Sequence, residues 1–142
     1  TLAINVGGAL IPVLISIYLL VQSAAMTGSL ATVFLALTGV AFVAVIAHLT
    51  SRVVPGLGIT TPFFVAPLAA LLCGLALPVP LGTGPMAAPV IAYTSGTLGV
   101  LIGADLLNLD RISDMAAPMV SIGGAGTFDG IFLAGVIAAF LA

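Results

Sequence analysis

The sequence predicts an all-α membrane protein, a bundle of about five transmembrane helices whose segments are interrupted by proline and glycine. Of the 142 residues, 62% are hydrophobic and only 4% are charged, and the mean hydropathy is +1.43. Soluble domains carry about 25% charged residues, so this composition cannot cover a surface exposed to water. The apolar runs are continuous, whereas the strands of membrane barrels alternate apolar and polar positions. We therefore expect a single helical domain over residues 1–142.

Five apolar segments approach the roughly 20 residues that a helix needs to cross a bilayer. They run over about 3–21, 29–49, 61–77, 86–109 and 123–142. The first carries a stripe at three- and four-residue spacing that should face other helices. This stripe consists of Asn5, Gly8, Pro12 and Ser16. A short polar loop is expected at 22–28, between the first two segments.

Individual residues of the second, third and fourth segments indicate their surroundings. The second ends beside His48, which we interpret as a solvated interfacial histidine. The third and fourth follow clusters of proline and glycine, and the third contains Cys73, interpreted as a small buried hydrophobic residue. In the fourth, the spacing of Gly99 and Gly103 predicts close helix packing.

The few charges restrict partners and orientation. Two arginines without any lysine cannot neutralise a phosphate backbone, so nucleic acid is excluded as a partner. With five spans, the loops that hold Arg52 and Arg111 lie on one side, and the positive-inside rule makes that side cytoplasmic. The lipid bilayer is the expected environment, and because five short helices bury little surface, self-association as a dimer is expected.

Two aspartates fall inside the predicted spans, where an ionisable side chain is costly and marks a functional site by default. Asp105 precedes the end of the fourth segment by about 6 Å of helix, and Asp129 lies about 9 Å into the fifth. Since these segments are consecutive, both carboxylates should lie at similar depth in one leaflet. Asp110 and Asp114 flank Arg111 and are interpreted as solvated loop residues.

Two carboxyl groups in one site share a proton, and such a pair activates water for attack on a carbonyl. Two structural alternatives stay open: Asp129 caps a helix by accepting the amides of Ile131 and Phe132, and Asp105 reaches the headgroup region. No cluster of histidine, cysteine and carboxylate has metal-ligand spacing, and no glycine run has the sequel of a phosphate loop. We therefore expect no metal and no cofactor.

Three stretches, 3–12, 103–109 and 121–130, resemble an uncharacterised family of small bacterial and archaeal membrane proteins. This resemblance covers most of the chain and implies the inner membrane of a prokaryotic cell. Separately, residues 124–135 resemble the Gly-x-Gly-Asp helix of presenilin-like and signal-peptide-peptidase-like intramembrane aspartyl proteases. That resemblance implies Asp105 and Asp129 as the catalytic pair, although the Pro-Ala-Leu motif of those proteases is missing here.

The leading functional hypothesis is an intramembrane aspartyl protease that cleaves a transmembrane peptide. Asp105 and Asp129 would activate water, and the substrate-binding residues would be Asn5, Asn108, Gly124, Gly126 and Thr127. The first alternative is a small ion or solute transporter or channel, with its site lined by Asn5, Asp105, Asn108 and Asp129. Proline-broken starts of the third and fourth segments favour it. A non-catalytic membrane subunit is the second alternative. In both the protease and the transporter hypothesis, Asn5 is expected to face the aspartates.

Overall fold

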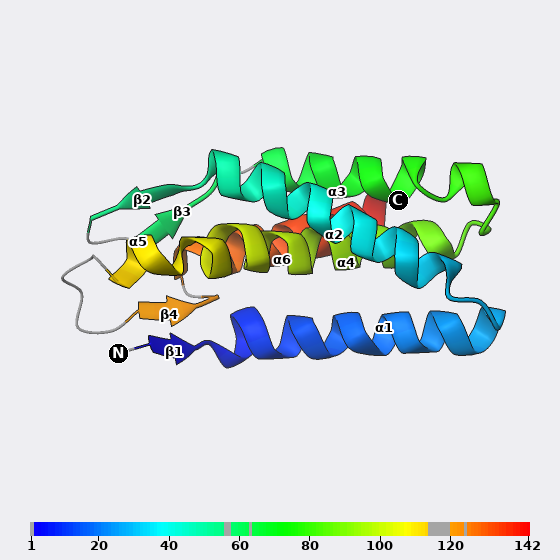
Figure 1. The fold of residues 1–142 in the computed structure, drawn as a ribbon, viewed down its shortest axis with the longest axis horizontal. Coiled ribbons are helices and arrows are strands. Elements are labelled where there is room, and N and C mark those ends of the chain that lie inside the picture. Colours follow the sequence, from blue (N-terminus) through cyan, green and yellow to red (C-terminus); the bar gives the residue numbers. More distant parts are fainter. Residues whose placement is uncertain (1, 56–57, 63, 114–119, 124) are drawn as a thin grey trace.

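The computed structural model describes residues 2–55, 58–62, 64–113, 120–123 and 125–142, and they are mostly helical (Figure 1). The helices are α1 (Ile11–Thr27), α2 (Ala31–Thr50), α3 (Val65–Ala76), α4 (Ala87–Val100), α5 (Leu109–Ser113) and α6 (Ala125–Leu141). Within the described residues, four short strands accompany them: β1 (Leu2–Ile4), β2 (Arg52–Val54), β3 (Gly58–Thr60) and β4 (Val120–Ile122). The predicted all-α membrane fold is confirmed.

Helix length and composition support a membrane location. Within the described residues, three helical runs are long and apolar enough to cross a bilayer: Val6–Thr27, Ala31–Thr50 and Ala87–Arg111, with 22, 20 and 25 residues. Two shorter apolar helices cover Val65–Leu81 and Ile131–Leu141. The chain is therefore an integral membrane protein.

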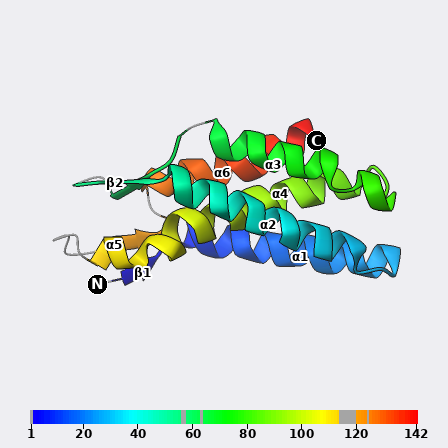
Figure 2. The same ribbon diagram turned by 45° about the horizontal axis from the view of Figure 1, so that its top comes forward.

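Helix α4 lies at the centre of the bundle. It packs against α1, α2, α3 and α6, and Figures 1 and 2 show α1 along one side. Most residues of α4 are buried, whereas Ser16 is the buried residue of α1. The antiparallel hairpin β2–β3, helix α5 and the N-terminus lie together at one end, which we call the arginine end because β2 contains Arg52 and α5 contains Arg111 (Figure 1). The two arginine segments thus share one end of the bundle, as the five-span topology predicts.

Glycines allow α4 and its continuation to approach α2 at backbone distance. A Cβ atom at Gly99 would lie 2.6 Å from the Cβ of Val43, and one at Gly103 would overlap the carbonyl oxygen of Ala44. Helix association in lipid depends on such close van der Waals contact, because lipid tails supply no hydrophobic drive. The close packing predicted from the spacing of Gly99 and Gly103 is confirmed.

Similar contacts join α4 to its other neighbours. A Cβ atom at Gly96 would lie 2.6 Å from the carbonyl oxygen of Ala134 on α6, and one at Gly74 on α3 would lie 2.7 Å from that of Ala88. Cys73, next to Gly74, is buried in this interface region, as predicted. Small residues therefore set the distances between the central helix and the helices around it.

Several boundaries differ from the predicted ones. Helix α1 continues to Thr27, through the stretch predicted as a polar loop, and ends where Gly28 adopts φ 64° and donates its N–H to Ala24. Polar side chains near a membrane surface are compatible with a helix, so only the left-handed glycine ends it. Helix α3 begins at Val65 rather than 61, because residues 58–60 pair with 52–54.

The two-stranded pairs were not predicted. β1 and β4 pair in parallel, with Leu2 opposite Val120 and Ile4 opposite Ile122. This pairing joins the start of the chain to the segment that leads into α6. It is the feature that assembles the candidate site.

Candidate functional site

Asp105 is buried inside the bundle, with 2% of its surface exposed. It is the last residue of a π-helical turn, Leu101–Asp105, which continues α4, and a 3₁₀ turn, Leu106–Asn108, connects it to α5. Such irregular turns inside helices occur frequently at functional sites. The interpretation that Asp105 reaches into the headgroup region is wrong, because the protein itself encloses this side chain.

The Asp105 carboxylate binds the backbone of the turn that precedes α6. Its Oδ2 accepts the N–H of Gly123 at 2.6 Å, a short bond of the kind that a charged acceptor makes. Gly123 has φ 71°, and a Cβ atom there would lie 2.6 Å from the carbonyl carbon of Gly8. Only glycine fits both the conformation and the space. Three distant segments, at Gly8, Asp105 and Gly123, therefore meet at one point.

The backbone of Asn5 lies beside the place where Gly8, Asp105 and Gly123 meet. Its N–H donates to the carbonyl of Ile122 at 2.9 Å, directly before Gly123. Its side chain is exposed, and Oδ1 accepts the N–H of Gly8 at 2.8 Å, which caps the π-helical turn Val6–Leu10. The structure thus gives Asn5 a capping contact next to the Gly123 turn, and its role in binding substrate stays a prediction.

Asn108 lies one helical turn beyond Asp105 and is also buried. Its Nδ2 donates to Ser51 Oγ at 2.9 Å, to Gly103 O at 3.2 Å and to Ala104 O at 2.8 Å. These bonds satisfy carbonyls where the helix departs from α geometry and tie it to the end of α2. Within the described residues, Asn108 Oδ1 has no donor, so one acceptor remains on this side of the site.

The other predicted carboxylate, Asp129, belongs to α6, which contacts the π-helical turn that carries Asp105. Because α6 begins at Ala125, Asp129 lies inside the helix, and the interpretation of Asp129 as an N-terminal cap is wrong. The structure describes Gly126, Thr127 and Asp129 only as part of the α6 backbone, and Gly124 and Asp114 lie outside the described residues entirely. The close approach of Asp105 and Asp129 therefore stays a prediction.

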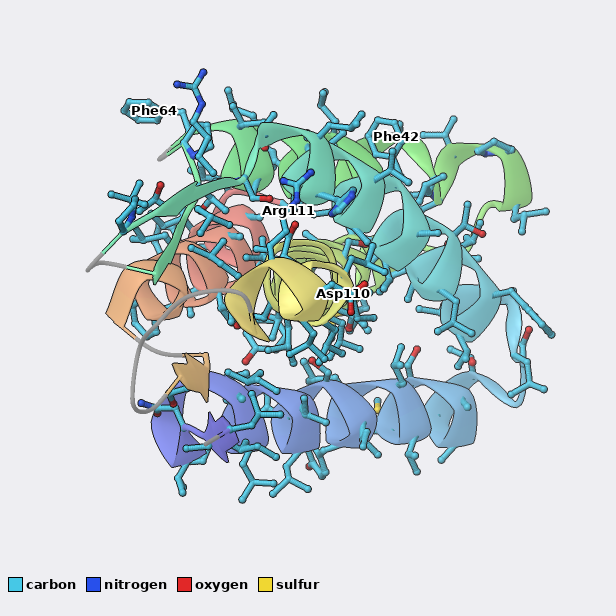
Figure 3. The ribbon with its side chains drawn as sticks, turned by 60° about the vertical axis from the view of Figure 1, so that its left-hand side comes forward. Phe42, Phe64, Asp110 and Arg111 are labelled. Atoms are coloured by element: carbon cyan, nitrogen blue, oxygen red, sulfur yellow. The ribbon has the colours of Figure 1, made fainter. Side chains whose placement is uncertain are left out.

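The two charged residues of α5 are far more accessible than Asp105. Asp110 and Arg111 are both exposed, as expected for Asp110, but they belong to helix α5 and not to a loop; Figure 3 shows them on α5 with the arginine end forward. His48, near the end of α2, is half-buried. Among the described residues, no group of three histidine, cysteine or acidic side chains could hold a metal ion.

Sequence reasoning missed a set of buried hydroxyl groups on α4. Thr94, Ser95 and Thr97 are each exposed by 1% or less. In the described structure the hydroxyls of Thr94 and Ser95 have no hydrogen-bond partner. The signal was present, since polar residues interrupt the middle of an apolar span there. Ser51, the partner of Asn108, was missed too, because it lies just beyond the second segment.

Neither a curated protein nor a solved structure matches this chain. A protein-family model does match, over residues 1–141, and it carries the description "Protein of unknown function (DUF1614)". The expectation of an uncharacterised family is thereby confirmed. Since the match covers nearly the whole sequence, the chain belongs to the DUF1614 family.

Proposed function

We propose that this protein is an aspartate-dependent intramembrane protease that cleaves transmembrane peptides, with Asp105 and Asp129 as its catalytic pair. The supporting observation is the hydrogen bond from Gly123 N–H to Asp105 Oδ2 at 2.6 Å. It attaches the turn that opens α6 to the buried carboxylate, and α6 carries Asp129. The host is a prokaryotic cell, in whose inner membrane the arginine end faces the cytoplasm.

Distances along the chain support a shared site. Asp129 lies four residues after Ala125, the first residue of α6, which is about 6 Å of helix rise. Helix α6 starts beside Asp105, and in this proposal the carboxyl group of Asp129 comes within reach of one water that bridges it to Asp105. In the proposed reaction one carboxylate removes a proton from water and the other, protonated, polarises the peptide carbonyl.

The start of α6 supplies the groups that would bind the carbonyl oxygen. The first-turn N–H groups of a helix lack intrahelical acceptors, and Gly126 and Thr127 belong to that turn. Gly123 does not contribute, because its N–H already donates to Asp105. Backbone donors directed at a developing oxyanion stabilise the transition state.

The test is cleavage of a quenched-fluorescent transmembrane peptide by protein reconstituted in liposomes. Asp105→Asn and Asp129→Asn should each reduce cleavage to background, whereas the exposed Asp110→Asn should leave it unchanged. Circular dichroism and elution volume confirm that the variants fold. Cleavage by Asp129→Asn at the wild-type rate would exclude the catalytic pair.

A proton or cation transporter is the second candidate, and buried oxygens along α4 favour it. The hydroxyls of Thr94 and Ser95 and the Oδ1 of Asn108 are buried without partners in the described structure. Thr94 and Ser95 lie on α4, before Asp105, and Asn108 lies in the 3₁₀ turn after it. Transport sites combine such mixed oxygen ligands with broken helices. Liposomes loaded with a pH-sensitive dye test this candidate: a proton flux that Asp105→Asn abolishes, in protein that cleaves no peptide, would replace the protease proposal.

A further inference from the structure

A pocket of about 460 Å³, lined by both polar and apolar residues, opens at the arginine end. The end of α2 and the hairpin β2–β3 form it, and its lining consists of Leu49, Thr50, Arg52, Thr60, Thr61 and Pro62. The hydroxyls of Thr50 and Thr60 already donate to Ile46 O at 2.7 Å and to Arg52 O at 3.3 Å. Within the described residues, the guanidinium of Arg52 and the hydroxyl of Thr61 make no hydrogen bond. The pocket therefore offers a cation and one free hydroxyl donor.

A separate apolar groove of about 200 Å³ lies between α3 and α6. Its lining residues are Phe64, Pro67, Leu68, Leu71, Leu133, Ile137 and Leu141. The lining positions span about 10 Å of helix rise on α3 and about 12 Å on α6. Phe64 lies at the periphery of the molecule, at the start of this groove (Figure 3).

The pocket and the groove lie next to each other. Pro62 lines the pocket and Phe64 lines the groove, and two residues span at most about 7 Å of chain. The pocket lies at the end of α2, a helix long and apolar enough to span a membrane, and the groove extends along the shorter apolar helices α3 and α6. We therefore expect the pocket at the level of the lipid headgroups and the groove in the hydrocarbon. A ligand that fills both needs an anionic head and a hydrocarbon chain.

We propose that this combined surface binds one phospholipid with a net negative headgroup. The guanidinium of Arg52 and the hydroxyl of Thr61 would bind the phosphate, since arginine matches the oxygen geometry of phosphate. Among the described residues no acidic side chain lines the pocket, so none of them receives the ammonium group of a zwitterionic lipid. One acyl chain would occupy the groove between α3 and α6. The carbonyls at the end of α2 also attract a cation, but among the described residues Arg52 donates to none of them.

Binding of phosphatidylglycerol and phosphatidylcholine to delipidated protein in detergent, followed by native mass spectrometry, tests the proposal. Phosphatidylglycerol should bind more tightly, and Arg52→Gln should weaken its binding about fivefold, the weight of one arginine near an anionic lipid surface. Arg111→Gln removes the same charge from exposed α5 and should have no effect. Leu68→Trp fills the groove and should reduce binding of both lipids, unlike Leu72→Trp on the exposed surface of α3.

Three results would overturn the proposal. Equal affinity for phosphatidylglycerol and phosphatidylcholine would show that the pocket does not select an anionic headgroup. If Arg52→Gln and Arg111→Gln weakened the binding of phosphatidylglycerol equally, the weakening would come from the overall charge of the protein and not from the pocket. Displacement by inorganic phosphate, with no effect of Leu68→Trp, would assign the pocket to a soluble anion instead.

Discussion

Replacing Gly123 by alanine tests the junction on which the candidate site depends. Gly123 has φ 71°, a conformation that costs an alanine roughly 1–2 kcal/mol. The new Cβ would lie 2.6 Å from the carbonyl carbon and 2.7 Å from the oxygen of Gly8, and these backbone atoms must shift. That shift separates the turn from Asp105 and removes a hydrogen bond to a charged group, worth about 1.5–3 kcal/mol. The expected loss is therefore about 2.5–5 kcal/mol in free energy of unfolding.

The chain offers a matched control for the backbone strain. Gly82 has φ 57°, but a Cβ atom there meets nothing within 4 Å. Gly82→Ala should therefore lose only the roughly 1–2 kcal/mol of the left-handed conformation. Unfolding by added dodecyl sulfate in mixed micelles, monitored by circular dichroism, gives both free energies. Equal losses from the two variants would refute the idea that Gly123 joins Gly8 to Asp105.

Three further predictions concern packing, the polar contacts and topology. Gly99→Ala should cost about 1–3 kcal/mol in the same unfolding assay, because its Cβ would lie 2.6 Å from the Cβ of Val43; an unchanged stability would mean that α2 and α4 separate easily. Asn108→Ala should lower the free energy of unfolding by about 1–3 kcal/mol, since it removes the three hydrogen bonds of a buried amide. A loss below about 0.5 kcal/mol, the usual effect of a surface substitution, would contradict the role of Asn108 in joining this turn to α2. Single cysteines replacing Arg52 and Arg111 in a cysteine-free background should react with an impermeant maleimide from the same membrane side; labelling from opposite sides would contradict the shared end.

Hydropathy and small-residue spacing predicted the helical bundle, although not all of its helix boundaries. The continuous apolar runs predicted a membrane bundle, and the spacing of Gly99 and Gly103 predicted the tight contact with α2. The three-residue strands could not be predicted in this way, since so short a segment has no periodicity. Their pairing depends on tertiary contacts, such as the alignment of Leu2 with Val120.

The candidate site was predictable only in part. The cost of a carboxylate in lipid indicated that Asp105 is enclosed, and it is. Its partner at Gly123 is a backbone amide, which every residue except proline possesses, so no residue type indicates it. The capping contact of Asn5 was not predicted: a residue before a helical turn can cap that turn, and its Oδ1 accepts the N–H of Gly8. The expectation that its side chain faces the aspartates stays a prediction.

The parallel pairing of β1 with β4 imposes an order on the biogenesis of this protein. Leu2 leaves the ribosome before its partner Val120, which is 118 positions later in the chain (120 − 2). At about 5–20 residues per second, the partner strand is synthesised about 6–24 s afterwards. During that interval α1 can enter the membrane, but its N-terminal strand has nothing to pair with. The enclosure around Asp105 consequently forms only after β4 and Gly123 have been synthesised, and a chain interrupted before β4 leaves this carboxylate without its Gly123 partner.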